Sequence, residues 1–227
     1  MKRIFLLIYK IITFLISLSL IWVFILKYSP LPITPVMIIN IFADIFDTGL
    51  IGINREWVNY SEISPNFFRA LMSAEDGRFM RHNGFDWDAI RNAQRYNEAH
   101  KGKKKRGAST ISMQTSKNVF LWHSRNYVRK AFEVYFTVLI EDVWGKKRIL
   151  EMYANAVEFG DGLYGVEAAS QRYFGKSASS IDRREAALLV AVLPNPHRWT
   201  PDKPTDYIMK RVAFIEGRMG GLGTPKE

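Results

Sequence analysis

The strongest pattern in the chain is an apolar run near its N-terminus. Residues 4–26 contain one charged side chain, Lys10. Twenty-three helical residues rise about 35 Å, at about 1.5 Å each, which is enough to cross the hydrocarbon core of a bilayer. Lys2 and Arg3 precede the run and only Lys27 follows it closely. This charge asymmetry predicts a transmembrane helix whose N-terminus stays in the cytoplasm.

A cleaved signal peptide is the alternative interpretation of this run. Its apolar region is normally shorter, and it ends in a cleavage site of small residues. After Leu26 the chain reads KYSPLPITP, and no alanine occurs before Ala43. We therefore expect an uncleaved anchor, with the rest of the chain outside the cytoplasmic membrane.

Beyond a proline-rich linker at residues 29–35, most of the pattern is helical. Ser64 and Pro65 are a typical helix start, with a capping serine and proline at the first helical position. The predicted helices cover residues 65–80, 86–99, 109–120, 127–144, 146–157 and 166–174, and a last one begins at the capping box of Asp182 and Glu185 and ends at Pro194. Residues 36–60 receive no assignment, and Gly160, Gly162 and Gly165 mark a loop. Few segments alternate like strands, so we expect a mainly α fold.

Composition narrows the choice of partner. Lys and Arg number 32 against 22 Asp and Glu, a net charge of +10, which indicates an anionic partner such as nucleic acid, a phospholipid surface or a phosphorylated substrate. Outside the membrane, lipid or pyrophosphate explains this charge better than nucleic acid. The absence of cysteine excludes disulfides and thiolate chemistry, and four histidines make a His-rich metal centre improbable.

A charged stretch closes the first of the predicted helices. Glu75 and Phe79 would share a helical face at i, i+4, and a carboxylate among aromatic side chains can act as a general base or acid. The alternative is a surface glutamate that pairs with Arg78 or Arg81. We interpret His82 as a hydrogen-bonded structural residue.

A second stretch, residues 107–118, places small and hydroxylated residues before a helix. Free N–H groups at such a helix start can bind an anion, and Lys117 adds a positive charge. The alternative is an ordinary capped helix with a solvated lysine.

A third stretch puts Glu133 in an otherwise apolar helix. A carboxylate there is costly unless it is paired, and Arg129 and Lys130 are its expected partners at i−4 and i−3. A helical salt bridge without catalytic meaning explains the same pattern.

Taken in order, these stretches resemble glycosyltransferase family 51, and most closely its monofunctional biosynthetic peptidoglycan transglycosylases. The resemblance covers about residues 50–215. The matching motif positions are Glu75, Asp76, Phe79, His82 and Gly84; Gly107, Ser109, Thr110, Gln114, Lys117 and Asn118; Arg129, Lys130 and Glu133; and Lys146 or Lys147, Ile149, Leu150, Tyr153, Asn155 and Gly160. The chain departs from the family at Met113, where the family has the first glutamine of a pair, and at Ala154, where leucine is usual.

The resemblance implies a lysozyme-like, two-lobed glycosyltransferase domain behind a single N-terminal transmembrane helix. We expect residues 1–27 to form the cytoplasmic tip and anchor, 28–60 a linker and entry segment, 61–220 the catalytic domain and 221–227 a tail. Since no room for a transpeptidase domain follows, a monofunctional enzyme is expected. The protein would lie in the cytoplasmic (inner) membrane as a single-pass protein, with apolar surface near residues 85–125 dipping into the bilayer and the basic loop 101–107 meeting the headgroups.

The implied activity is polymerisation of lipid II into β-1,4-linked glycan strands, with inversion and release of undecaprenyl pyrophosphate. Glu75 would be the base, and Glu133, the second catalytic carboxylate, either orients the cations or binds a divalent ion. The substrate-binding residues implied are Lys117, Arg125, Arg129, Lys130, Ser109, Thr110, Gln114, Asn118, Asp76, Phe79 and His82. No cofactor is required, although a divalent cation (Mg²⁺ or Mn²⁺) is compatible with the chemistry. The expected partners are lipid II, the growing glycan-linked undecaprenyl pyrophosphate and the membrane, with other cell-wall synthesis proteins as candidates and no nucleic acid.

Two alternatives use the same residues differently. A membrane-anchored, lysozyme-like wall hydrolase also needs a glutamate in a helical cleft, but it needs no cluster of cations for a pyrophosphate. A non-enzymatic basic scaffold would explain Met113 as decay of a motif, but it would not explain why both Glu75 and Glu133 are present.

Overall fold

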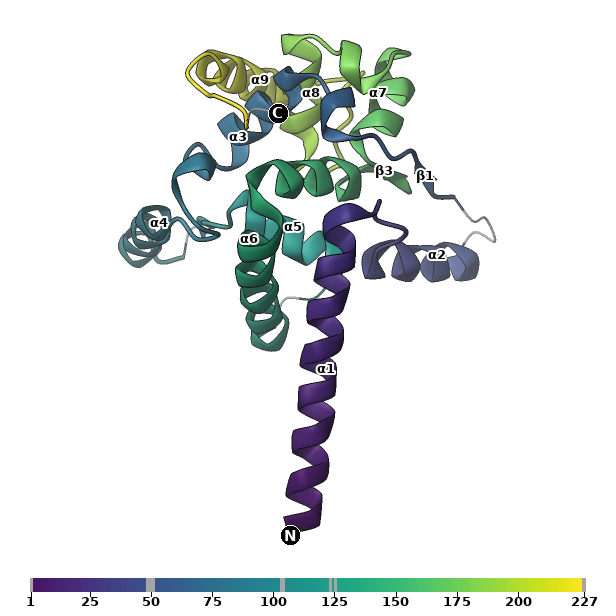
Figure 1. The fold of residues 1–227 in the computed structure, drawn as a ribbon. Coiled ribbons are helices and arrows are strands. Elements are labelled where there is room, and N and C mark those ends of the chain that lie inside the picture. The colour runs from purple at the N-terminus through teal and green to yellow at the C-terminus, as the bar shows by residue number, and fades with distance from the viewer. Residues whose placement is uncertain (1, 48–51, 103–104, 123, 125, 226–227) are drawn as a thin grey trace.

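A computed structural model describes residues 2–47, 52–102, 105–122, 124 and 126–225, except for the side chains of residues 43–47. Helix α1 (Lys2–Tyr28) projects from the body of the protein as a single long rod (Figure 1). Its apolar side chains are exposed apart from Val23 and Leu26, which are fully buried against the rest of the chain. The predicted N-terminal helix is therefore confirmed as a helix.

The body of the protein is mainly helical and has two lobes (Figure 1). The upper lobe holds α3 (Pro65–Glu75), α7 (Val166–Phe174), α8 (Arg183–Val192) and α9 (Asp206–Met219), and the lower lobe holds α4 (Trp87–Ala99), α5 (Ile111–Phe120) and the first part of α6 (Tyr127–Ala156). Helix α3 packs against α8 and α9, and α5 packs along α6. The mainly α fold is as predicted.

Side chains cap several helices where the sequence predicts a start. Ser64 accepts a hydrogen bond from the backbone of Asn66, and Asp182 and Glu185 form the predicted capping box of α8. Asp86 and Thr110 cap α4 and α5 in the same way. These caps satisfy N–H groups that have no partner inside their own helices.

Helix α3 is shorter than predicted. It ends at Glu75, and the chain then turns through Asp76 (φ −160°) into a short 3-10 helix, η2 (Phe79–Arg81). Glu75 and Phe79 therefore do not share a helical face, and that expectation was wrong. The turn allows the Asp76 side chain to reach the lower lobe, an interaction that local sequence does not reveal.

Helix α6 is two helices joined at a sharp kink. Gly145 has φ 72° and ψ 167°, a conformation that is essentially restricted to glycine. The two segments agree with the predicted helices 127–144 and 146–157. The kink lets α6 line the lower lobe with its first part and run beneath the upper lobe with its second (Figure 1).

A small three-stranded sheet replaces the loop predicted at Gly160, Gly162 and Gly165. Strand β1 (Asn54–Arg55) pairs in parallel with β3 (Leu163–Tyr164), which pairs antiparallel with β2 (Glu158–Gly160). At Gly162 a Cβ atom would lie 2.0 Å from the carbonyl oxygen of Gly52, so only glycine fits between these strands. Strands of two or three residues are too short to show an alternating pattern, which is why sequence reasoning missed them.

Other elements also received no assignment from sequence. They are α2 (Pro35–Asp47), α9, and the short 3-10 helices η1 (Tyr60–Glu62) and η3 (Ala178–Ser180). Helix α2 follows the linker and lies beside the C-terminal end of α1, running across the direction of that helix (Figure 1).

Replacing Gly145 by alanine tests the kink. No side chain or backbone atom lies within 4 Å of the position that a Cβ would take, so only backbone strain opposes the change. We expect Gly145→Ala to lower the free energy of unfolding by about 1–3 kcal/mol, measured by thermal and chemical denaturation in detergent. Gly217→Ala is the matched control, because Gly217 lies in α9 with open space around it and alanine should stabilise a helix by up to about 1 kcal/mol. Equal effects of the two changes would contradict the strain at Gly145.

Candidate active site

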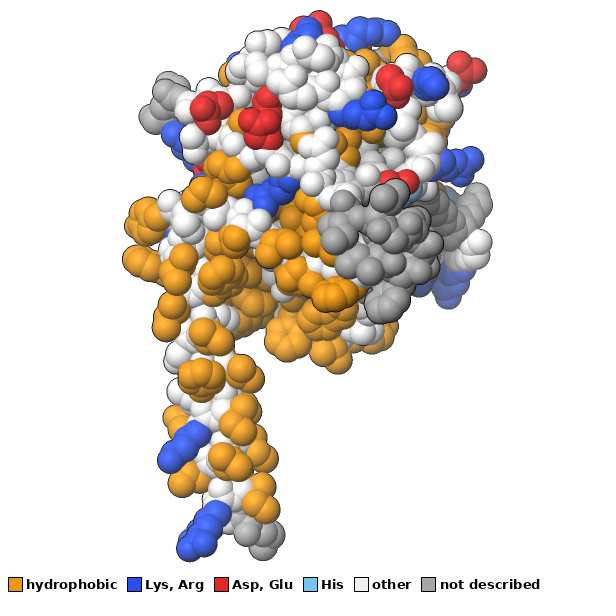
Figure 2. Space-filling view, turned by 90° about the vertical axis from the view of Figure 1, so that its right-hand side faces the viewer, with side chains coloured by type: hydrophobic (Ala, Val, Ile, Leu, Met, Phe, Trp, Pro, Cys, Tyr) orange, Lys and Arg blue, Asp and Glu red, His pale blue; other side chains and the backbone are white. Residues whose placement is uncertain are grey.

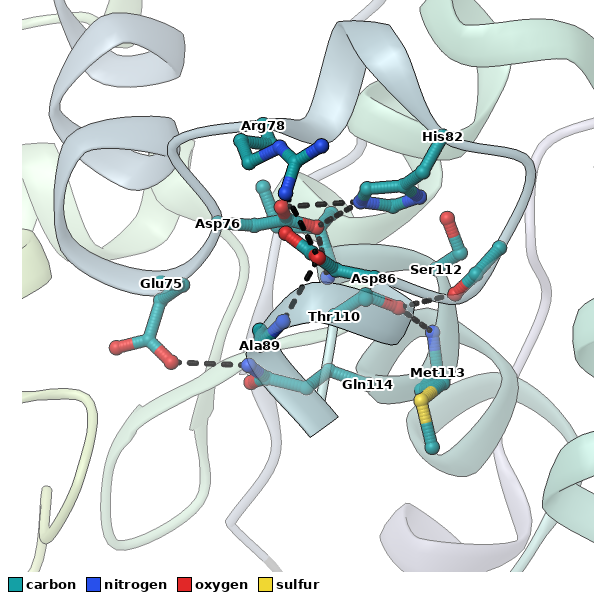
Figure 3. A network of polar contacts seen from close by, with 12 residues as sticks. Glu75, Asp76, Arg78, His82, Asp86, Ala89, Thr110, Ser112, Met113 and Gln114 are labelled. Atoms are coloured by element: carbon teal, nitrogen blue, oxygen red, sulfur yellow. Dashed lines mark hydrogen bonds and ion pairs between the residues drawn. The ribbon is translucent and has the colours of Figure 1, made fainter. Parts of the chain in front are cut away.

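Glu75 lies at the C-terminal end of α3 and faces the lower lobe. The side-chain amide of Gln114 on α5 donates a hydrogen bond of 2.9 Å to Glu75 Oε2 (Figure 3). Arg211 Nη2 on α9 lies 3.9 Å from Oε1. Arg78 pairs instead with Asp86 and Asp88, so it does not neutralise Glu75 as the alternative interpretation supposed. Both carboxylate oxygens of Glu75 are thus oriented by residues of other helices.

Asp76 joins the two lobes directly beside Glu75. His82 Nε2 lies 3.0 Å from both carboxylate oxygens of Asp76, and the backbone N–H of Ile111 donates to Oδ2 at 3.1 Å (Figure 3). A carboxylate at the first turn of α5 is favoured by the N–H groups and dipole of that helix. The hydrogen bonding predicted for His82 is thereby confirmed, and its substrate-binding role stays a prediction.

Gln114 is itself held in one orientation. The hydroxyl of Tyr153 donates to Gln114 Oε1 at 3.3 Å, which leaves the amide N–H groups to face Glu75. Burial raises the pKa of Tyr153 well above its usual value, and the charge of Glu75 adds to this effect. The tyrosine therefore keeps its proton and stays a donor throughout the neutral range.

A cavity of about 670 Å³ brings the predicted carboxylates and cations together. Its lining residues are Glu75, Ser109, Met113, Gln114, Lys117, Trp122, Ser124, Arg129, Lys130 and Glu133. Glu133 is 3% exposed and accepts from Arg129 Nη1 at 2.6 Å and from Lys130 Nζ. Its predicted helical pairing is confirmed, and it turns both cations towards the cavity. The buried Nε of Arg129 has no hydrogen-bond partner among the described residues.

Lys117 contributes a desolvated cation to the same cavity. Burial lowers the pKa of its ammonium group, and the neighbouring Arg129 and Lys130 lower it further. The charges of Glu133 and Glu75 partly offset this effect. An ammonium group held in this way gains more from an incoming anion than a solvated lysine does. The interpretation of Lys117 as merely solvated is therefore wrong.

A second cavity of about 590 Å³ adjoins the first at Glu75. It is lined by Ala74, Glu75, Asp76, Gly77, Arg78, Asp86, Ala89, Gly107, Ala108, Ser109, Thr110, Gln114 and Arg218. Glu75, Ser109 and Gln114 line both cavities. One carboxylate thus stands between a cation-lined space and a second space, where it can accept a proton from a molecule bound in one of them.

The remaining predicted residues lie outside these two spaces or outside the described chain. Phe79 is 1% exposed and contacts His82 behind the cavities. Asn118 lies on α5 but lines neither cavity, and Arg125 lies outside the described residues. The substrate-binding roles of these positions stay predictions.

Sequence reasoning missed several residues of the site, among them four from outside the motif stretches. Arg211 and Arg218 come from α9, and Trp122 and Ser124 follow α5. The two arginines lie far along the chain from Glu75 and within no local pattern that relates them to it. Trp122 and Ser124 follow the helix that carries Lys117, so their proximity to Lys117 was the only available signal.

No group of three or more His, Asp or Glu side chains in the described part of the chain is arranged to hold a metal ion. Both oxygens of Glu133 already accept from cations. A divalent ion would therefore fit this cavity only together with a ligand that carries its own anionic oxygens.

Comparisons with known proteins agree with this site. A family model described as "Transglycosylase" matches residues 45–220. The chain is 49% identical over 201 residues to the biosynthetic peptidoglycan transglycosylase of Bdellovibrio bacteriovorus, covering 88% of this chain and 80% of that one. It is 50% identical over 193 residues to that of Rhodospirillum centenum, covering 85% and 80%. With that of Haemophilus influenzae it shares 48% identity over 202 residues, covering 88% and 81%.

Replacing Lys117 by methionine should stabilise the fold. Because burial lowers the pKa of Lys117, its charged form lowers the free energy of unfolding. Methionine has a similar volume and no charge, so it removes this effect. We expect the free energy of unfolding at pH 7 to rise by about 0.5–2 kcal/mol, measured by denaturation in detergent. The gain should shrink as the pH rises through the lowered pKa, because the wild type then releases its proton on folding and becomes more stable. Lys210→Met, at an exposed position of α9, is the control and should change little; a destabilised Lys117→Met variant would contradict the cost of burial.

Proposed function

The chain belongs to the transglycosylase family and is a peptidoglycan glycosyltransferase, and we propose that it polymerises lipid II into β-1,4-linked glycan with inversion at the donor sugar. The growing glycan on undecaprenyl pyrophosphate would be the donor, and an incoming lipid II would be the acceptor. The observation that carries this proposal is the place of Glu75, between a cavity lined by three cations and a second adjoining cavity. A lipid-linked peptidoglycan precursor carries an anionic pyrophosphate, which matches the three cations of the first cavity.

Glu75 is proposed as the general base. A sugar 4-hydroxyl is a poor nucleophile at neutral pH and needs a base within hydrogen-bond reach. As its oxygen forms a bond to C1 of the donor sugar, its proton passes to Glu75 and the bond from C1 to the pyrophosphate oxygen breaks. The electron pair leaves with the pyrophosphate, and Glu75 returns the proton to solvent before the next cycle. Attack from the face opposite the leaving group converts an α-linked donor into a β-linked product.

The cation-lined cavity is suited to the leaving group. Negative charge increases on the departing pyrophosphate, and cations fixed beforehand in a desolvated site lower the barrier. Lys117, Arg129 and Lys130 supply such charges, and arginine can bind a phosphate through two N–H groups. Glu133 then acts through Arg129 and Lys130 by holding them in position. We propose that no cofactor is required, and that Mg²⁺ or Mn²⁺ enters, when present, with the pyrophosphate.

A wall hydrolase is the second candidate function. The one observation that favours it is that Glu75 lies in a cleft between helices. Hydrolysis of glycan needs one water molecule and no site for pyrophosphate. The three cations in one cavity with Glu75 favour the transferase.

Replacing Glu75 by glutamine tests this proposal. With detergent-solubilised protein and labelled lipid II, we expect wild type to make lysozyme-sensitive polymer and Glu75→Gln to be about 10²–10⁴-fold slower. Glu56→Gln, at an exposed glutamate, is the matched control and should keep wild-type activity. Assays with EDTA and with added Mg²⁺ test whether a metal is needed.

Two results would contradict this proposal. Release of soluble fragments from purified wall by the wild type, with no consumption of lipid II, would establish the hydrolase. Full polymerase activity in Glu75→Gln would remove Glu75 from its role as base.

We also propose that α1 is an uncleaved single-pass anchor with its N-terminus in the cytoplasm. Helix α1 is long and apolar enough to cross a membrane, and Lys2, Arg3 and Lys10 lie towards the end expected in the cytoplasm. Because the chain has no cysteine, single cysteines report topology. Lys210→Cys should react with an impermeant thiol reagent on intact cells of a Gram-positive host or on spheroplasts, and Lys2→Cys only after permeabilisation. The reverse pattern, or a mature protein that lacks the first 26 residues, would contradict this topology.

A further inference from the structure

We propose that one face of α9, formed by Tyr207, Arg211, Phe214 and Arg218, binds the glycan strand beyond the sugar that reacts at Glu75. These four residues are called the α9 face below. The inference rests on the proposed function for its ligand, and it goes beyond that function by adding a binding surface that extends outside the two cavities. By retaining the strand between cycles, this surface would increase the length of the product.

The α9 face is a continuous stripe on one side of the helix. Its members stand at intervals of four, three and four residues, so they follow one another along the helix axis. The same spacing, one position later in the chain, gives the side that packs into the domain, namely Ile208, Val212, Ile215 and Met219. The α9 face therefore borders the buried side of the helix. It is about 17 Å long, at about 1.5 Å per residue.

The α9 face is continuous with the candidate active site. Arg211 Nη2 lies 3.9 Å from Glu75 Oε1, and its Nε donates to the carbonyl oxygen of Ala191 at 3.2 Å. Arg218 lines the second cavity, and its Nη2 lies 3.1 Å from the position that a Cβ of Gly77 would take. Glycine at this position thus leaves room for the guanidinium group. A molecule bound beside Glu75 is already within reach of α9.

Between and beyond the two arginines, the α9 face exposes aromatic rings. Phe214 is 57% exposed and Tyr207 is 52% exposed. The guanidinium group of Arg218 lies 4.9 Å from the centroid of the Phe214 ring. The ring of Trp199 lies 5.2 Å from that of Tyr207. Each ring is thus supported by a neighbour while about half of it stays open to solvent, and a patch of this kind with a polar rim marks a binding surface.

Alternating rings and arginines match the chemistry of a peptidoglycan strand. A sugar ring presents C–H groups on its faces, and the negative face of an aromatic ring attracts them. Hydroxyl and N-acetyl oxygens at the sugar edges can accept from the N–H groups of arginine. The peptide stems add carboxylates, which a guanidinium group binds through two N–H groups. The α9 face therefore suits a polymer of amino sugars that carries acidic peptides.

The proposed reaction requires the strand to extend in this direction. Its reducing end carries the pyrophosphate, which would lie among Lys117, Arg129 and Lys130 in the lower lobe. The sugars that follow must therefore extend away from these cations. Helix α9 belongs to the upper lobe and packs against α3, the helix that ends at Glu75. The α9 face thus offers these sugars an exposed surface beside Glu75.

A lipid surface is not the expected partner of the α9 face. Helix α9 lies at the opposite end of the protein from the N-terminus of α1 (Figure 1). On the side of the molecule that Figure 2 shows, apolar side chains gather along α1 and on the lower part of the domain. Charged side chains are spread over the upper part of the same side. The exposed rings of α9 are therefore separate from the apolar surface around α1.

The apolar surface predicted at residues 85–125 needs correction. Among the described residues of that range, only Trp87 and Trp122 are large apolar side chains that are exposed. More of them are exposed on α1, α2 and α6. The amphipathic pattern of single helices did not reveal which of them the rest of the fold would cover.

Binding of a glycan without lipid tests the α9 face directly. Tyr207→Ala with Phe214→Ala removes both exposed rings and keeps the two arginines. Isothermal titration calorimetry uses the full chain in detergent and a peptidoglycan octasaccharide that carries neither lipid nor pyrophosphate. We expect the Kd of the octasaccharide to rise about tenfold in this variant, because two stacking contacts are lost. The Kd of the disaccharide, which is too short to span the α9 face, should stay within about twofold in the same comparison.

The matched control exchanges the two rings without removing them. Tyr207→Phe with Phe214→Tyr keeps an aromatic face at each position, so it should bind the octasaccharide as wild type does. Lys210→Ala, at an exposed position of the same helix outside the α9 face, should also leave binding unchanged. An octasaccharide Kd that is the same in wild type and in the alanine variant would overturn the proposal, as would the absence of binding by wild type at millimolar octasaccharide.

Product length gives a second readout. With labelled lipid II in detergent, the alanine variant should couple the first two molecules within about twofold of the wild-type rate and make strands about threefold shorter, because a strand held at fewer contacts dissociates sooner. Strands of wild-type length would overturn the role in retention. An equal loss in the first coupling would indicate damage to the catalytic site and count against the proposal.

The two proposals fail in distinguishable ways. A wild type that binds the octasaccharide through the two rings but makes no polymer would refute the proposed function alone. A wild type that polymerises lipid II, with an alanine variant unchanged in both binding and strand length, would refute the α9 face alone.

Discussion

The candidate site depends first on the buried carboxylate of Asp76. Its two oxygens accept from the first turn of α5 and contact His82, and so they connect the end of α3 in the upper lobe to the start of α5 in the lower lobe. Glu75 is the preceding residue, so this connection also determines which way Glu75 points. Burying a carboxylate without such partners would destabilise the fold. Here the N-terminus of α5 offsets this cost, because it supplies an N–H donor and a favourable dipole.

Helix α6 carries much of what the function requires. Its first part presents Arg129 and Lys130, held by Glu133, to the cavity, and its second part places Tyr153 behind Gln114. Around the kink at Gly145, Trp144 and Arg148 bind the carbonyl groups of the anchor. One helix therefore relates the cations of the cavity, the orientation of Glu75 and helix α1 to one another. Such a link suits the proposed reaction, whose two substrates would both be confined to a membrane.

Several charged groups of the site are buried in a way that stability alone does not favour. Lys117 has its pKa lowered by burial, and Glu133 is almost fully enclosed with its two cations. Replacing a buried ion pair by apolar residues often leaves stability unchanged or improves it. Their presence is understandable if an anionic ligand completes the cluster, because desolvated cations arranged beforehand stabilise developing negative charge strongly.

The sequence alone predicted most of the helices, including the long apolar helix at the N-terminus, because caps and apolar periodicity are local signals. It predicted the pairing of Glu133 with Arg129 and Lys130 because these residues lie one helical turn apart. It did not predict that α3 ends at Glu75, since the reason is an interaction of Asp76 with a helix 35 residues further along the chain. Nor did it place Arg211 beside Glu75 or Trp144 beside Val23, because such contacts arise only when helices distant in the chain pack together. The packing of one face of α1 against α6 was likewise decided by tertiary structure, because it joins segments that lie far apart in the chain.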